Sequence, residues 1–297
     1  MKRVLTAVVL IPLVVVMVFK AHPAFLLLVV GGVSYFCARE FVEIAKGHGL
    51  RPLKLLLFTF VLLPYLVPFL MSFTHEGLRE IATPFFLTLV VFSPFVFLAS
   101  AMFRRNMNEA LPSAAMSLFG FLYIGVGLFS VWYLSVWRDY GTLFVLCLLL
   151  IVWSGDISAY YVGTYLGRRK LAPRISPNKT WEGAIASFAI ATGIASVILV
   201  NFDPVFRWLF TLGLASLPEP SIHLPVFPSW FCLSASAIIN IAAQLGDLME
   251  SAMKRGANLK DSGTILPGHG GMLDRIDALL FAGPVAMLLF VAGEMSF

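Results

Sequence analysis

Long runs of apolar residues without charges dominate the sequence and limit what the chain can fold into. Nine such runs are present, and most approach the roughly 20 residues that a helix needs to cross a bilayer. Of the 297 residues, 59% are hydrophobic and 12% are charged, whereas an ordinary soluble domain has about 25% charged residues. Barrel strands would be about ten residues long and alternate in polarity. The sequence therefore predicts an all-α integral membrane protein and excludes a soluble globule, a disordered chain and a disulfide scaffold.

These runs define the transmembrane helices that we expect. They cover residues 4–19, 24–45, 55–73, 81–103, 111–137, 142–166, 181–200, 230–249 and 274–293. The first run could pass for a signal peptide, but it ends at Lys20 without a clear cleavage site, so we expect it to be retained. A proline-rich stretch before the eighth run contains residues 206–210, which either lie flat in the membrane interface or form a re-entrant piece.

Basic residues are distributed unequally between alternate connections. If the N-terminus is inside, the inner segments carry 16 Lys and Arg residues and the outer connections carry four. By the positive-inside rule, this places the N-terminus in the cytoplasm and the C-terminus outside. The net charge of +5 then reflects topology and anionic lipid headgroups, and no nucleic acid partner is needed to explain it. We therefore expect a multi-pass protein of the inner (cytoplasmic) membrane.

Charged residues are concentrated at the end of the eighth run and beyond it. Residues 247–277 are a tenth of the chain and hold a quarter of its charged residues. If the eighth helix continues to residue 255, its polar residues fall at i, i+3, i+4 and i+7 and share one face. These residues are Asp247, Glu250, Ser251 and Lys254. Ionisable groups at a membrane edge usually serve a function, so we interpret this stripe as part of a site.

A glycine-rich bend and two more acids follow the stripe. Gly270 and Gly271 allow the backbone to bend and expose N–H groups to an anion, and the start of the last helix also attracts phosphate. Asp274 and Asp277 face the same way there, and one helix cap would explain only one of them. Carboxylates beside cations favour Mg²⁺ with a nucleoside di- or triphosphate. Zinc is disfavoured because His269 is the one nearby His, and no P-loop pattern occurs.

The connection between the sixth and seventh runs also carries candidate residues. Asp156 lies inside the sixth run, and isolated intramembrane acids are functional candidates. Ser176 and Lys179 come just before the seventh helix, where we expect them to contact a phosphate or a headgroup. Thr180 is expected to cap that helix. The basic residues 168–170 are explained more simply as a membrane anchor.

Residues 251–277 read SAMKRGANLKDSGTILPGHGGMLDRID. This stretch resembles the complete signature of the phosphatidate cytidylyltransferase family, also called CDP-diacylglycerol synthases. Residues 175–183 are similar to a second block of that family, in which Lys is more common at the position of Asn178. The resemblance covers the C-terminal half, whereas the first five runs match only in being hydrophobic.

The resemblance implies synthesis of CDP-diacylglycerol and pyrophosphate from CTP and phosphatidic acid. It implies one or two divalent cations, Mg²⁺ above all, with a monovalent cation as a further possibility. The implied metal carboxylates are Asp247 and Asp274, with Asp277 and Asp156 as further candidates. The implied phosphate contacts are Lys254, Arg255, Lys260 and Arg275. The implied catalytic residues are Asp247, Asp274, Lys254 and Lys260. Ser251 and His269 would orient groups by hydrogen bonds, and Gly270 and Gly271 would let the backbone approach the substrate.

By the same count of basic residues, we expect the active site to face the cytoplasm. The resemblance also implies a homodimer. We expect residues 141–297 to form the catalytic region and residues 1–140 to form a scaffold with dimer contacts. Two alternatives remain open from the residues alone. One is an ion-coupled transporter whose intramembrane acids bind cations. The other is a different membrane enzyme of phosphorylated lipids, such as a CTP-using polyprenol kinase or a sugar-phosphate transferase.

Overall fold

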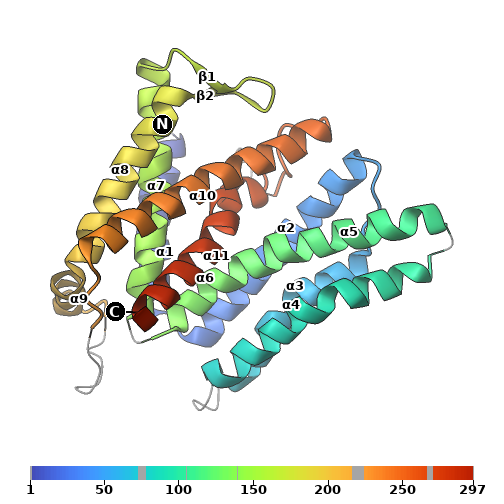
Figure 1. The fold of residues 1–297 in the computed structure, drawn as a ribbon, viewed down its shortest axis with the longest axis horizontal. Coiled ribbons are helices and arrows are strands. Elements are labelled where there is room, and N and C mark those ends of the chain that lie inside the picture. Colours follow the sequence, from blue (N-terminus) through green and yellow to red (C-terminus); the bar gives the residue numbers. More distant parts are fainter. Residues whose placement is uncertain are drawn as a thin grey trace.

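The computed structural model describes residues 2–72, 78–104, 106–138, 140–215, 224–265 and 270–296, and these are almost entirely helical (Figure 1). The long helices are α1 (Lys2–Lys20), α2 (Pro23–Gly47), α3 (Lys54–Met71), α4 (Leu78–Met102), α7 (Gly141–Tyr165), α8 (Trp181–Val200), α10 (Ser229–Gly256) and α11 (Leu273–Ser296). Shorter elements are η1 (Met107–Glu109), α5 (Ala110–Gly120), the π-helical η2 (Phe121–Val126), α6 (Gly127–Val136) and α9 (Phe202–Thr211).

The expected class of all-α membrane protein is confirmed. Among the described residues, eight helical segments are long and apolar enough to cross a membrane. One of them, residues 107–136, is built from η1, α5, η2 and α6 in succession. The described apolar part of α1, Ile11–Lys20, is shorter than a span. The total of nine spans and the membrane side of each terminus therefore stay predictions.

Two elements lie between the expected spans. Strands β1 (Lys170–Ala172) and β2 (Ser176–Thr180) form an antiparallel hairpin that connects α7 to α8, with Lys170 opposite Thr180. Thr180 ends the hairpin and caps α8 as expected, because its Oγ1 accepts a hydrogen bond of 3.2 Å from the Gly183 N–H. Helix α9 accounts for residues 206–210 and buries Phe206 and Leu209.

Helix α11 joins the two sides of the bundle. Figure 1 shows it between α7 on one side and α2 and α6 on the other, with α10 crossing its upper part. Glycines let it pack closely on α6: a Cβ on Gly127 would come within 2.7 Å of the Leu280 carbonyl, and a Cβ on Gly283 within 2.9 Å of the Gly127 carbonyl. Small residues at helix crossings allow this approach in membranes. The expected division into a scaffold (residues 1–140) and a catalytic region (residues 141–297) stays a prediction.

A test of this packing is to replace Gly127 by Ala. The added methyl group meets backbone atoms of α11, so the helices have to separate, and overpacking of this kind costs about 1–3 kcal/mol. We expect a lower thermal midpoint in detergent, measured by scanning fluorimetry. The matched control is Gly193→Ala in α8, where a Cβ would meet nothing within 4 Å. An equal midpoint for both variants would contradict the close crossing.

Candidate active site

The polar stripe of α10 forms one wall of the candidate site. Lys254 lies between two acids: its Nζ is 2.5 Å from Glu250 Oε2 and 2.5 Å from Asp274 Oδ1 of α11. The Glu250 side chain is fully buried, and its Oε1 has no hydrogen-bond partner among the described residues. Ser251 Oγ donates a long hydrogen bond of 3.5 Å to Asp247 Oδ1, one turn back. The stripe expected from the spacing is therefore present.

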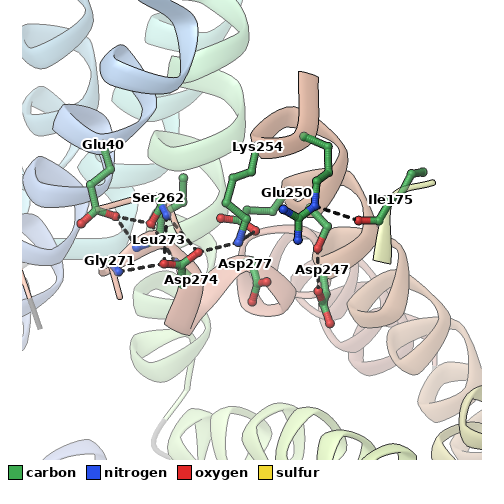
Figure 2. Close-up of polar contacts among 12 residues, drawn as sticks. Glu40, Ile175, Asp247, Glu250, Lys254, Ser262, Gly271, Leu273, Asp274 and Asp277 are labelled. Atoms are coloured by element: carbon green, nitrogen blue, oxygen red, sulfur yellow. Dashed lines mark hydrogen bonds and ion pairs between the residues drawn. The ribbon is translucent and has the colours of Figure 1, made fainter. Parts of the chain in front are cut away.

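Asp274 ties the loop before α11 to this wall. Its carboxylate accepts hydrogen bonds from the backbone N–H of Ser262, at 3.0 and 3.2 Å, and from that of Gly271, at 2.7 Å, as well as from Lys254 (Figure 2). In return, Ser262 Oγ accepts a hydrogen bond of 3.3 Å from the Asp274 N–H. Asp274 therefore acts as a structural anchor in this state, with only 7% of its side chain exposed.

Glu40 of α2 is a functional candidate that the sequence analysis missed. It is buried, and its carboxylate accepts hydrogen bonds from Ser262 Oγ at 2.7 Å, from the Met272 N–H at 2.9 Å and from the Leu273 N–H at 2.8 Å. The first N–H groups of a helix have no partner within the helix and attract negative charge. Glu40 thus caps α11 from another helix. The sequence feature that could have identified Glu40 is the position of an acidic residue inside an apolar run.

The glycines of the loop are explained by these carboxylates. A Cβ on Gly263 would come within 2.5 Å of Glu40 Oε1, and a Cβ on Gly271 would overlap Glu40 and Ser262. Gly270 has a φ of +82°, which favours glycine, and a Cβ there would lie 2.7 Å from Asp274 Oδ2. Gly270 and Gly271 therefore leave room for Glu40 and Asp274. Their expected role in letting the backbone approach a phosphate stays a prediction.

The hairpin supplies the opposite wall. Lys179 Nζ forms an ion pair of 2.5 Å with Asp247 Oδ2. Arg255 Nε donates a hydrogen bond of 3.3 Å to the carbonyl of Ile175, next to Ser176 at the start of β2. The hairpin and the end of α10 are therefore joined, and the two sequence blocks meet at one end of the bundle.

Acids outnumber the cations paired with them at the centre of the site. Asp277 is close enough to Asp247, Glu250 and Asp156 to interact with all three electrostatically, and Figure 2 shows it between the Lys254 pair and Asp247. With Asp274 there are five carboxylates, of which Asp247, Glu250 and Asp274 form ion pairs with Lys179 or Lys254. No group of three or more acidic, His or Cys side chains within the described ranges is arranged to hold a metal ion. The surplus of negative charge nevertheless fits a bound cation, since acids gathered at the edge of a membrane need compensating charge.

The remaining candidates are exposed or lie outside the described residues. Lys260, Arg255 and Arg275 are exposed around the site, and Asp156 is exposed on α7. His269 belongs to residues 266–269, which lie outside the described residues. The arrangement as a whole offers cations for phosphates and carboxylates for a metal, beside membrane-spanning helices.

Comparison with known proteins decides the family. A family model described as "Cytidylyltransferase family" matches residues 1–292. The chain belongs to the cytidylyltransferase family. This result confirms the resemblance and extends it to the first five apolar runs.

Several relatives in this family carry the name phosphatidate cytidylyltransferase. The protein of Bacillus subtilis is 41% identical over 151 residues, which are 51% of this chain and 48% of that protein. The Staphylococcus saprophyticus protein is 34% identical over 197 residues, 66% of each chain. The Thermotoga maritima protein is 33% identical over 233 residues, 78% of this chain and 77% of the relative. The chain thus aligns with about half of the first relative's length and about two thirds of the second's.

The capping role of Glu40 can be tested with a matched pair of variants. Glu40→Gln replaces one of the two acceptor oxygens by an NH2 group, which then faces the N–H of Met272 or that of Leu273, so we expect the free energy of unfolding to fall by about 2 kcal/mol. Glu43→Gln, one turn later on the exposed side of α2, removes only a surface ion pair with Lys46 and is expected to have little effect. Thermal unfolding in detergent measures both. Equal stability of the two variants would show that Glu40 does not cap α11.

Proposed function

We propose that this protein transfers the cytidylyl group of CTP to phosphatidic acid and releases CDP-diacylglycerol and pyrophosphate. The observation that carries the proposal is the meeting of the two sequence blocks at one end of a membrane bundle, where carboxylates and lysines alternate. The names of the relatives agree with this reaction. A lipid substrate also suits a site that lies beside helices able to cross a bilayer.

The reaction needs orientation and neutralisation of charge more than a strong base. An oxygen of the lipid phosphate attacks the α-phosphorus of CTP, and the bond between the α-phosphorus and the bridging oxygen breaks, so that pyrophosphate leaves with that oxygen. A phosphate monoester is largely ionised at neutral pH, so its attacking oxygen carries no proton that has to be removed. Catalysis then rests on positioning the two phosphates and on offsetting their negative charge.

The basic residues of the site are suited to hold these phosphates. Lys179 and Lys254 are each held by acids in the structure and can exchange a carboxylate partner for a phosphate oxygen. Arg255, Lys260 and Arg275 are exposed and would bind the triphosphate. Ser251 lies beside Asp247 and would orient a substrate oxygen by a hydrogen bond.

We propose Mg²⁺ as the cofactor. Asp247 and Asp277 would hold it, with Asp156 and Asp274 as further ligands, because these acids exceed the cations paired with them. The ion would neutralise the triphosphate and align it when bound. We further propose that this end of the bundle faces the cytoplasm, where CTP is available, and that the protein resides in the inner membrane as a homodimer.

The direct test is an assay of the purified protein in detergent–lipid micelles. CTP labelled in the α-phosphate is incubated with phosphatidic acid, with and without Mg²⁺. We expect label in a lipid product only when phosphatidic acid and Mg²⁺ are both present. Transfer of label to an added polyprenol when the γ-phosphate of CTP is labelled instead would support the kinase, and uptake of ions into vesicles without any labelled lipid would support the transporter.

Substitutions can distinguish the proposed catalytic role of Asp247 from the structural role of Asp274. Asp247→Asn removes charge without breaking a helix cap, so we expect activity to fall at least about 100-fold while the thermal midpoint stays within a few degrees. Asp274→Asn is expected to lose activity and stability together, because its carboxylate holds the loop at Ser262 and Gly271.

Asp203→Asn serves as the control for these variants, since Asp203 pairs with Arg207 on the surface of α9. It should keep the wild-type rate. Rates near wild type for Asp247→Asn would contradict the assignment of the site.

A further inference from the structure

A second basic site lies at the same end of the bundle, outside the candidate active site. A cavity of about 340 Å³ is lined by Lys46 at the end of α2, by Arg51 and Pro52 in the connection to α3, by Lys54 at the start of α3, and by Arg104 after α4. This volume falls within the range of about 300–1,000 Å³ that is common for ligand sites. Four of its five lining residues are cations.

The grouping of these four cations around one cavity is not explained by the positive-inside rule alone. Positive charge at helix ends is expected on one side of a membrane, but such charge normally spreads over the surface. Here Arg104 is fixed in place, because its Nη2 donates hydrogen bonds to the carbonyls of Arg51, at 2.8 Å, and Pro52, at 3.3 Å. These bonds hold the end of α4 against the α2–α3 connection and give the cavity a built wall.

Acids compensate these cations only in part. Glu43 pairs with Lys46 at 2.5 Å, and Glu109 lies 3.9 Å from both Arg51 and Arg104, which is long for an ion pair in water. Lys54 has no ion pair to an acid among the described residues. The cavity therefore keeps a net positive charge and favours an anion.

The surroundings of the cavity select a ligand with an apolar part. Leu55 follows Lys54 and is 83% exposed, and Phe103 precedes Arg104 and is 91% exposed. Exposed apolar side chains directly beside basic ones are typical of a position where headgroups meet acyl chains. We propose that this cavity binds the phosphate headgroup of an anionic glycerophospholipid, whose acyl chains lie along α3 and α4. The proposal is independent of the enzymatic activity.

The cavity also adjoins the loop that Glu40 holds. Lys54 lines a neighbouring cavity of about 410 Å³, together with Arg39, Glu40, Ser262 and Thr264. A lipid bound in the basic cavity would therefore be separated from the Glu40–Ser262 contact by this neighbouring cavity.

The test measures lipid binding by native mass spectrometry of the full-length protein in detergent. Phosphatidylglycerol is the anionic probe and phosphatidylcholine is the zwitterionic reference, because neither is a substrate of the proposed reaction. The variant Arg51→Gln/Lys54→Gln changes two exposed side chains and should reduce the affinity for phosphatidylglycerol by about tenfold, without changing that for phosphatidylcholine.

The control carries the same change of charge elsewhere at this end of the bundle. Arg168→Gln/Arg169→Gln alters exposed residues of the expected membrane anchor next to the hairpin and should lower the affinity for phosphatidylglycerol clearly less than the cavity variant does. An equal loss in both double variants would overturn the proposal, as would equal binding of the two lipids by the wild type. Full displacement of phosphatidylglycerol by millimolar pyrophosphate would also overturn it, because the site would then serve a soluble phosphate.

Discussion

The buried carboxylate of Glu40 is the interaction on which the rest of the site depends. A charge inside a membrane protein is costly unless hydrogen bonds satisfy it, and Ser262 Oγ and the Met272 and Leu273 N–H groups do so here. The same bonds complete the first turn of α11. Because Ser262 is bonded in turn to Asp274, the position of the acid on α11 follows from a residue of α2.

One chain of polar contacts then crosses the bundle. It runs from Glu40 through Ser262 to Asp274, and on through Lys254 to Glu250 of α10 (Figure 2). Each carboxylate in it lies within reach of a lysine or of backbone N–H groups. Such a network is rigid when complete, and it presents charge at one end of the bundle, where phosphates could exchange for carboxylates. The proposed nucleotidyl transfer uses this property.

The sequence predicted the parts of this fold that depend on local spacing. A helix in lipid satisfies its own backbone, so the apolar runs located the spans, and the i, i+3, i+4, i+7 pattern located the α10 stripe. Contacts between distant segments were not predictable in this way. Glu40 lies 222 residues before its partner Ser262. No periodic pattern in the sequence predicts a contact between residues so far apart. The pairing of Lys179 with Asp247 was missed for the same reason, although both residues were candidates.

Hydrogen exchange of the wild-type protein tests the central claim most directly. If Glu40 caps α11, the amide hydrogens of Met272 and Leu273 are bonded to a buried carboxylate and should exchange far more slowly than that of the exposed Thr264 in the same loop. Exchange at Met272 and Leu273 as fast as at Thr264 would mean that the first turn of α11 is open to water. The link from α2 to the carboxylates of the site would then be absent.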